Sequence, residues 1–408
     1  MNKKWSRKVM MADVLVLALL AVPLVYAATE APAGFDNLTN GVSTQAQFDL
    51  DLAVFEEFEV TDDGLGPVYN AQACRECHQN PVTGATSQIT ELRVARFDGF
   101  FYTDRPGGSL INDRAIHPNI QERVAGEDNV QTFRTSLNTL GDGFVEAIAE
   151  ATFTSIKNLQ PSGMKGQTIN VPILESPGFT RIGRFGWKDQ QASLLSFSAD
   201  AYLNEMGITS PLQPTETTSN GASVAAYDTL ADPEEAPETG QPFGPDVEAF
   251  ARFMRSTKAP PRDTVLAATS DAITGSNLFT SIGCSHCHRT SITTAPVGST
   301  FNGTGAGKFT VNAGLGDKII HPYSDFLLHD VGTGDGIIQN GGSSTFTKLR
   351  TPPLWGLRTR SRFMHDGENT TRNNAILRHT NEAEPVIQNY INLSTTQKNQ
   401  LITFLNSL

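Results

Sequence analysis

The spacing of apolar residues predicts helices over much of the chain. Phe48, Leu52, Phe55 and Phe58 recur at helical intervals and would share one side of a helix. The segments with this period are 45–58, 193–206, 246–254, 272–281 and 395–405, the last one opened by Ser394. The pattern therefore favours a mainly α fold.

Other patterns interrupt the helices. Apolar and polar residues alternate between 88 and 101, which predicts a short strand or hairpin. The stretch 210–245 is rich in Pro, Thr, Glu and Gly and is expected to be a surface loop. The Pro-Pro pair in 258–262 predicts a linker between two domains. We therefore expect long loops and minor β structure beside the helices.

The first 27 residues have the pattern of an export signal. Four basic residues among the first eight precede an apolar run from 14 to 25, and Ala27 lies where a signal peptidase would cut. A membrane anchor is the alternative, but the run contains Pro23 and is shorter than the ~20 apolar residues of a span. We expect 1–27 to be a signal peptide, the protein to be periplasmic, and the mature chain to lack a transmembrane span.

The net charge narrows the range of partners. The whole chain carries −12, and removal of 1–27 takes away four basic residues and one acidic residue, which leaves −15. This charge disfavours nucleic acid and anionic membranes and would suit a basic electron-donor protein, although solubility alone also accounts for it.

All four cysteines lie in two Cys-x-x-Cys-His motifs. These are Cys74/Cys77/His78 and Cys284/Cys287/His288. Two disulfides, or a zinc site, would be the alternatives for an exported protein with four cysteines. The histidine directly after each pair instead indicates two covalently bound haem c groups, in which the sulfurs form thioethers and the histidine binds iron.

The elements around the second motif have the order of a small cytochrome c domain. The helix 272–281 leads through Gly283 into the motif, so the haem would pack on that helix. We expect two cytochrome c-like domains, 28–257, with loop insertions including 210–245, and 263–408, with their haems facing a shared interface.

The sixth ligand of each iron decides its chemistry. A filled position favours electron transfer, whereas an open one binds peroxide or oxygen. His286 lies inside its own motif and is a poor candidate. Composition does not choose among the others, which are His117, His321, His329, His365, His379, Met206, Met254 and Met364.

Longer blocks of sequence resemble a known family. The blocks are G-L-G-P-V-Y-N-A-Q-A-C-R-E-C-H-Q-N-P at the first motif, R-F-G-W-K-D-Q-Q-A-S-L from 184, Y-L-N-E-M-G from 202, L-R-T-P-P-L-W-G-L-R-T-R-S-R-F-M-H-D-G from 349 and A-I-L-R-H-T-N-E-A-E from 375. In this order they resemble the bacterial di-haem oxidoreductases, which are related to the di-haem cytochrome c peroxidases, MauG and the di-haem rubber oxygenases. The resemblance covers about 34–408.

The resemblance implies different roles for the two haems. The N-terminal haem would be peroxidatic, and the C-terminal haem would store or relay electrons. The distal ligand of the C-terminal haem would be His379, with Met364 as the runner-up, unless His379 merely caps a helix face. A His288/His379 pair would give a lower potential than His/Met ligation.

The resemblance also implies two catalytic residues. Trp187 matches a family Trp between the haems and would relay electrons, with a buried aromatic anchor as the alternative. Trp355 is a further relay candidate but is expected to pack. Glu205 matches a Glu above the open face of the peroxidatic haem, unless it is an ordinary helical residue. It would take a proton from one peroxide oxygen and return it to the other.

The chain departs from typical di-haem peroxidases after the first motif. No histidine lies within 79–101, and His117 is only a distant candidate for the missing labile ligand. We therefore expect the first haem to be five-coordinate or water-bound. The family also holds calcium between its domains, and the matching carbonyls here belong to 360–362, so calcium is an additional candidate cofactor.

These expectations describe a peroxidase-like di-haem oxidoreductase. Hydrogen peroxide or another small oxidant would react at the first haem, and a small redox protein would supply electrons to the second. One alternative is a pure electron-transfer cytochrome with both irons six-coordinate. The other is an oxygenase, or a MauG-like enzyme that oxidises another substrate.

Overall fold

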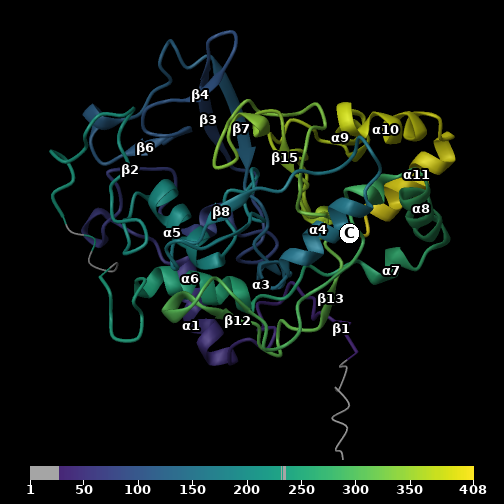
Figure 1. The fold of residues 1–408 in the computed structure, drawn as a ribbon, viewed down its shortest axis with the longest axis horizontal. Coiled ribbons are helices and arrows are strands. Elements are labelled where there is room, and N and C mark those ends of the chain that lie inside the picture. The colour runs from purple at the N-terminus through teal and green to yellow at the C-terminus, as the bar shows by residue number, and fades with distance from the viewer. Residues whose placement is uncertain (1–26, 231, 233–235) are drawn as a thin grey trace, which may run out of the picture.

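The computed structural model describes residues 27–230, 232 and 236–408 (Figure 1). Helix makes up 31% of the structure and strand 16%, so helix exceeds strand as expected, although less than a third of the structure is helical. The predicted signal peptide lies outside the described residues apart from Ala27. Within the described ranges, no helix combines the length and apolar character needed to cross a membrane.

The helices are spread along the whole described chain. They are α1 (Gln45–Glu56), α2 (Cys74–Cys77), α3 (Asp142–Glu146), α4 (Glu150–Leu159), α5 (Leu194–Ala201), α6 (Pro245–Ser256), α7 (Thr264–Ala267), α8 (Ser270–Ser281), α9 (Arg372–Leu377), α10 (Glu384–Ile391) and α11 (Thr395–Leu405).

The strands are mostly short. They are β1 (Thr29–Glu30), β2 (Val68–Tyr69), β3 (Thr90–Phe97), β4 (Tyr102–Asp104), β5 (Leu110–Ile111), β6 (Arg114–Ala115), β7 (Val130–Thr135), β8 (Asn170–Pro172), β9 (Thr180–Ile182), β10 (Ile292–Thr293), β11 (Thr300–Phe301), β12 (Phe309–Thr310), β13 (Lys318–Ile320), β14 (Leu328–His329) and β15 (Leu349–Arg350).

Helices α1, α5 and α6 pack together near one end of the molecule (Figure 1). The Thr44 side chain caps α1 by accepting a hydrogen bond from the Gln47 amide (3.2 Å). The prediction for 45–58 is confirmed as far as Glu56. Phe58 is a correction, because the chain becomes extended at Glu57 and leaves Phe58 54% exposed. The predicted helix 193–206 is α5 followed by a π-helical turn, Tyr202–Met206.

Helix α8 leads into the second haem motif and packs on α11. Gly275 makes this close approach sterically allowed, because a Cβ at this position would overlap the Gln400 carbonyl. Ser394 caps α11 and forms a capping box with Gln397, as the sequence predicts.

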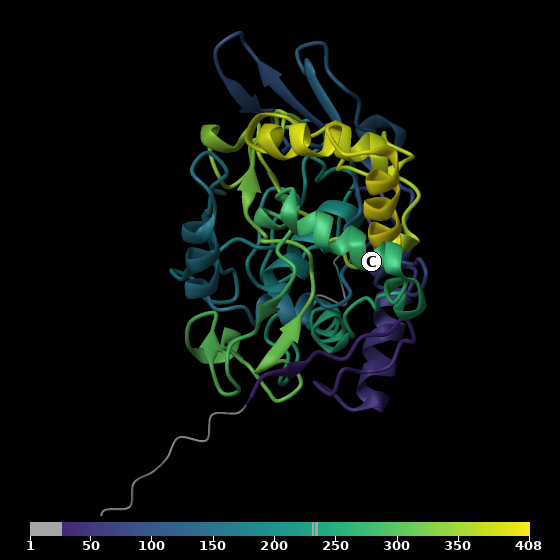
Figure 2. The same ribbon diagram turned by 90° about the vertical axis from the view of Figure 1, so that its right-hand side faces the viewer.

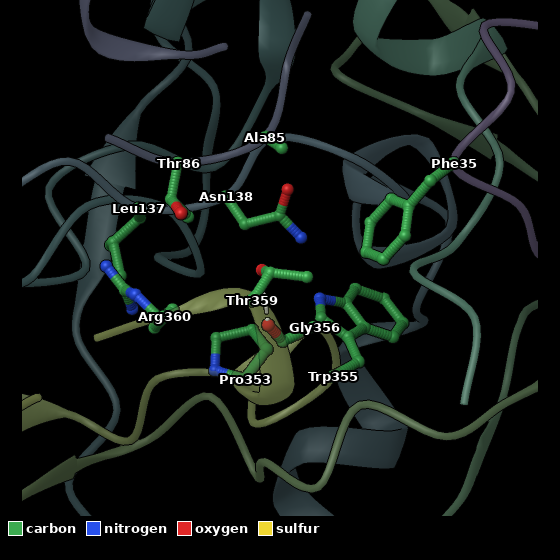
Figure 3. Close-up of a pocket in the computed structure, with 10 residues that line it drawn as sticks. All are labelled: Phe35, Ala85, Thr86, Leu137, Asn138, Pro353, Trp355, Gly356, Thr359 and Arg360. Atoms are coloured by element: carbon green, nitrogen blue, oxygen red, sulfur yellow. Dashed lines mark hydrogen bonds between the residues drawn. The ribbon is translucent and has the colours of Figure 1, made fainter. Parts of the chain in front are cut away.

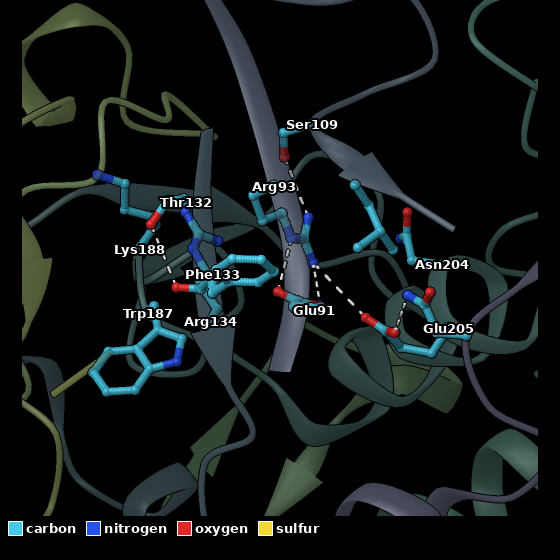
Figure 4. A network of polar contacts seen from close by, with 12 residues as sticks. Glu91, Arg93, Ser109, Thr132, Phe133, Arg134, Trp187, Lys188, Asn204 and Glu205 are labelled. Atoms are coloured by element: carbon cyan, nitrogen blue, oxygen red, sulfur yellow. Dashed lines mark hydrogen bonds and ion pairs between the residues drawn. The ribbon is translucent and has the colours of Figure 1, made fainter. Parts of the chain in front are cut away.

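The strand predicted within 88–101 is β3, which forms the centre of the largest sheet. It pairs antiparallel with β4, β5 and β7, and its register with β7 runs from Thr90 opposite Thr135 to Ala95 opposite Val130. The hairpin tip projects at the top of Figure 1, whereas the other end of β3 reaches into the molecule. Figure 4 shows that this inner end carries Glu91 and Arg93 into a cavity.

The main hydrophobic core includes residues from both sides of the predicted linker 258–262. Phe55 and Phe253 belong to this core together with Phe309 and Trp355, so Trp355 packs as expected. The N-terminal β1 also crosses to pair in parallel with β13 (Figure 2). The two segments share one core, and the domain boundaries at 257 and 263 stay a prediction.

A buried ion pair ties α3 to α6 in this core. Both oxygens of Glu146 accept hydrogen bonds from Arg255 (2.6 and 2.9 Å), and Glu146 also accepts one from the Leu194 amide at the start of α5 (3.0 Å). Burial alone would raise the pKa of Glu146, but Arg255 and the Leu194 amide lower it.

Replacing Arg255 by Met is expected to destabilise the protein by about 3–5 kcal/mol at neutral pH, because Glu146 would be left buried without its partner. Denaturant unfolding followed by circular dichroism measures the change. The penalty should shrink as the pH is lowered, because protonation neutralises the stranded Glu146.

The matched control is Lys258→Met, which removes an ion pair with the 42%-exposed side chain of Asp36. This variant should lose no more than about 1 kcal/mol. Equal losses in the two variants would contradict a structural role for the buried pair.

Candidate active site

The first haem motif lines a large internal cavity. Cys74 is the first residue of α2 and Cys77 is the last, and His78 is the C-cap of that helix. The Nδ1 of His78 donates to the Ala85 carbonyl (3.2 Å), which orients the ring and fixes its tautomer. All three side chains line a cavity of about 610 Å³, called the larger cavity below.

The second motif lines a separate cavity. The chain turns at Gly283 (φ 106°) directly after α8 and enters Cys284. The Nδ1 of His288 donates to the Tyr323 carbonyl (2.9 Å), which repeats the arrangement at His78. Cys284, Cys287 and His288 line a cavity of about 190 Å³, called the smaller cavity below.

The chemical states of these side chains suit haem attachment. The four cysteines form no disulfide in the structure. Burial raises the pKa of Cys77 and of Cys284 to about 12, so both remain thiols. Burial, helped by nearby His379, lowers the pKa of His288 to about 4, so its imidazole is neutral, as a metal ligand must be.

His379 faces His288 across the smaller cavity. The two ring centroids are 6.5 Å apart, and the Nδ1 of His379 donates to the Ala375 carbonyl within the α9 segment (2.9 Å). Two imidazoles on opposite sides of one iron would have centroids roughly 6 Å apart, given metal–nitrogen bonds of about 2 Å. Met364 lines the same cavity and adopts a positive φ of 66°.

The other histidines are placed less favourably for ligation. His117 stacks on Tyr227 (4.6 Å between centroids) and lines neither cavity. Both ring nitrogens of His329 are bonded to carboxylates, of Asp325 (2.9 Å) and Glu382 (2.7 Å). His321 pairs with Glu30, and His365 lines the smaller cavity beside Trp187.

A carboxyl pair lies in the larger cavity (Figure 4). Arg93 donates to both oxygens of Glu91 (2.7 and 3.0 Å) and lies 3.8 Å from an oxygen of Glu205. Asn70 donates to the other oxygen of Glu205 (2.9 Å). The Glu205 side chain is 31% exposed and lines the same cavity as His78.

The two carboxyl groups differ in how strongly they hold a proton. Burial and the neighbouring Glu91 raise the pKa of Glu205 well above its usual value, which favours its protonated form. Burial also opposes ionisation of Glu91, but Arg93 outweighs it and lowers the Glu91 pKa to about 2. The pair therefore combines an acid with a carboxylate, and it can both give and accept a proton.

Trp187 lies between the two cavities and lines both. Its Nε1 donates to the Thr135 carbonyl (2.9 Å), and the Thr135 amide donates to the His365 carbonyl (2.7 Å). The side chain is only 6% exposed. Trp187 is thus fixed by hydrogen bonds at the boundary between the two haem motifs.

Buried charges next to Trp187 hold this boundary in place. Lys188 donates to the Thr345 and Lys348 carbonyls (2.7 Å each) and pairs with Asp335 (3.1 Å). Arg134, at the end of β7, donates twice to Asp335 (2.9 and 2.7 Å). The loop preceding β15 is thereby tied to both the sheet and the Trp187 segment.

A small cavity of about 10 Å³ lies near Ala85, beside the predicted calcium stretch (Figure 3). Asn138 Nδ2 and Trp355 Nε1 line it as donors without a hydrogen-bond partner, and Arg360 adds a positive charge. The Asn138 oxygen already accepts from the Leu140 amide (3.2 Å). These donors fit a water molecule and not a cation, so this cavity gives calcium no support.

Comparison with known proteins places the chain in a family. The family model described as "Di-haem oxidoreductase, putative peroxidase" matches residues 110–408. The chain belongs to this di-haem oxidoreductase family. The family therefore implies two haem cofactors and an oxidoreductase activity.

Two solved structures match this di-haem oxidoreductase over nearly the whole chain, with low sequence identity. Kuenenia stuttgartiensis hydrazine synthase has 12% identity over 100% of both chains with a TM-score of 0.42. A MauG-like protein associated with microbial copper homeostasis has 15% identity over 95% of both chains with the same TM-score. None of the curated proteins matches the chain.

Sequence reasoning missed the partners of Glu205. Glu91 and Arg93 are two residues apart in the predicted strand, so alternation already placed them on one face. Their proximity to Glu205 and Asn70 depends on contacts over more than 100 residues of sequence, for which the sequence carries no local signal.

Proposed function

We propose that this di-haem oxidoreductase reduces hydrogen peroxide at a haem held by Cys74, Cys77 and His78. Electrons would come from a second haem held by Cys284, Cys287 and His288. The observation that carries the proposal is the difference between the two cavities. The larger one is lined by a carboxyl pair as well as by His78, whereas the smaller one has a histidine on each side.

The residues present fit two covalently attached haem groups. Each motif offers two thiols and an imidazole with its Nδ1 bonded to a backbone carbonyl, which leaves Nε2 as the ligand atom. Bound haem supplies the one-electron redox chemistry that peroxide reduction requires. At the second site, His379 is the proposed sixth ligand, and Met364 is the side chain that would replace it.

The carboxyl pair has a defined role in this proposal. Glu205 delivers its own proton to the departing oxygen, so water leaves, and it takes up the proton that peroxide releases from its other oxygen. Glu91, held ionised by Arg93, keeps the pKa of Glu205 raised. The Arg93 guanidinium stabilises the negative charge that develops on the departing oxygen. Asn70 holds Glu205 in position throughout. The mechanism thus keeps the role that the sequence assigns to Glu205 and adds Glu91 as the group that raises its pKa.

Access to the first site is part of the proposal. Among the described residues, His78 is the one histidine that lines the larger cavity, because His117 lies elsewhere. Met206 and Met254 also line this cavity and are the side chains able to close it. We propose that neither does so, and that peroxide enters here.

Trp187 is the proposed route for electrons between the two sites, because it lines both cavities. A small, basic redox protein is the proposed electron donor, and the acidic charge of the chain supports it. The proposal also includes export to the periplasm with cleavage near Ala27, supported by the sequence of residues 1–27 and by the haem attachment motifs.

The low-temperature EPR spectrum of the ferric holoprotein tests the ligand assignment. We expect one high-spin signal from the first haem and one low-spin signal from the second. His379→Ala should alter only the low-spin signal, because its imidazole is on the far side of the smaller cavity from His288. Two low-spin signals in the unaltered protein would contradict an open first site.

His321→Ala is the matched control for this substitution, since His321 is half exposed and pairs with Glu30 at the surface. It should leave both signals unchanged. If Met364→Ala abolishes the low-spin signal while His379→Ala does not, Met364 is the ligand and the assignment of His379 is wrong.

Glu205→Gln tests the proton transfer. The second-order rate constant for the reaction with hydrogen peroxide is expected to fall by about 10²–10⁴, because the amide cannot deliver the proton. In the unaltered protein the rate constant should decline as pH rises through the raised pKa of Glu205, since the proton is lost above it. This alkaline decline should be absent in the variant.

The matched control is Glu127→Gln, a substitution of a 62%-exposed carboxylate outside both cavities. Stopped-flow absorbance of the haem measures both variants. A rate constant for Glu205→Gln equal to that of the control would exclude Glu205 from the chemistry.

A further inference from the structure

Tyr202 is a second oxidisable side chain in the larger cavity. It opens the π-helical turn that follows α5, and its ring lines the cavity and packs edge-on against Phe250 (5.0 Å between centroids). Its side chain is 1% exposed. Unlike Trp187, it lines the larger cavity without lining the smaller one, so it lies on a different route from the first haem site.

The Tyr202 hydroxyl lies between two carboxylates. It is 3.1 Å from Glu59 Oε1 and 3.2 Å from Asp246 Oδ2. A phenol has one proton to donate, so it cannot satisfy both acceptors at once. When both carboxylates are ionised, three oxygens share this single proton, whereas one uncharged acceptor would be enough to stabilise a buried hydroxyl.

Glu59 is the more deeply buried of the two carboxylates. It is 2% exposed, and its second oxygen, Oε2, has no hydrogen-bond partner. Burial raises the pKa of Glu59 to about 7, so this group takes up or releases a proton near neutrality. Buried carboxylate oxygens normally have a hydrogen-bond partner, so packing alone does not account for Glu59 at this position.

The two carboxylates that contact Tyr202 differ in their exposure to solvent. Asp246 is half-buried in the first turn of α6. Phe58 and Val60, on either side of Glu59 in the chain, are 54% and 49% exposed. The Tyr202 ring therefore lines the haem cavity, while its hydroxyl contacts one fully buried carboxylate, Glu59, and one half-buried carboxylate, Asp246.

We propose that Tyr202 is a redox-active residue that is oxidised by the first haem after that haem has reacted with peroxide. Tyr202 gives one electron to the oxidised haem. Its O–H bond breaks, and the proton forms a new O–H bond on the Glu59 carboxylate, which leaves a neutral tyrosyl radical. One electron from a reductant, with return of the proton from Glu59, restores the phenol.

This inference rests on the proposed function, because peroxide is the oxidant. It adds a place where one oxidising equivalent is held when the second haem has no electron to give. Asp246, which is half-buried, is the side on which an external reductant would come closest to this equivalent.

The experiment uses the full holoprotein, in which tyrosines carry deuterium on the ring, mixed with an equimolar amount of hydrogen peroxide without reductant. Samples frozen at successive times are examined by EPR. We expect the high-spin haem signal to fall and a narrow radical signal to appear, with a line shape that changes on deuteration. Tyr202→Phe, which keeps the ring, should abolish this radical.

Tyr390→Phe is the matched control, because Tyr390 is also buried but its hydroxyl donates to an amide oxygen, Asn373 Oδ1 (2.7 Å). It should leave the radical unchanged. Glu59→Gln keeps the phenol and should lower the radical yield, because the amide cannot take the proton. This variant also tests the proposal if Tyr202→Phe fails to bind haem.

The outcomes separate the two proposals. If peroxide removes the high-spin signal but the radical is absent, is not a tyrosyl, or persists in Tyr202→Phe, the role of Tyr202 is overturned and the proposed function stands. An undiminished radical in Glu59→Gln overturns Glu59 as the proton acceptor. If peroxide leaves the high-spin signal unchanged, the proposed function fails, and the role of Tyr202 fails with it.

Discussion

The hydrogen bonds from His78 and His288 to backbone carbonyls are the constraint on which the rest of the site depends. Each histidine directly follows the second cysteine of its motif, so the motif sets the position of its backbone. The hydrogen bond that Nδ1 makes then sets the orientation of the ring. Ala85 and Tyr323 provide carbonyls at 3.2 and 2.9 Å. These carbonyls come from loops. The Ala85 loop is held by Thr139, whose hydroxyl donates to the Gly84 carbonyl (2.7 Å), and Tyr323 packs on Phe279 of α8 and Phe404 of α11. The irregular backbone is therefore what fixes the tautomer at each candidate iron ligand.

The two cavities differ in the charges that surround them, and this difference supports different chemistry at each one. Glu91, Arg93 and Glu205 line the larger cavity, and burial together with the Glu91 charge raises the pKa of Glu205. Around the smaller cavity, His288 and His379 face each other as neutral rings, and nearby His329 is already bonded to two carboxylates. A proton donor is useful where a bond in the substrate breaks, whereas two neutral ligands favour electron exchange without rearrangement.

Local signals in the sequence predicted the parts of this structure that local physics determines. The helical period and the cap at Ser394 gave the position of α11, and alternation gave β3. The haem motifs could be recognised in the sequence because two thioethers and an imidazole ligand require a fixed spacing of Cys, Cys and His. The Glu91–Glu205 contact was not predictable in this way, because it joins a strand to a turn over 100 residues later. Likewise, the main core joins residues from both sides of 258–262, and β1 pairs with β13, although no local pattern indicates either contact.

The environments of Trp187 and Tyr202 suit different kinds of oxidation. Trp187 donates its Nε1 proton to a backbone carbonyl, which is too weak a base to take that proton, so electron transfer there would proceed without proton transfer. Tyr202 has a carboxylate within hydrogen-bond distance, and a phenol that loses an electron must also lose its proton to form a neutral radical. In the proposed mechanism, an electron passing through Trp187 would therefore move quickly between the sites, whereas an oxidising equivalent at Tyr202 would be held until Glu59 returns the proton. The hydrogen-bond partner of each ring, more than the ring itself, would therefore make Trp187 a relay for electrons and Tyr202 a site that holds an oxidising equivalent.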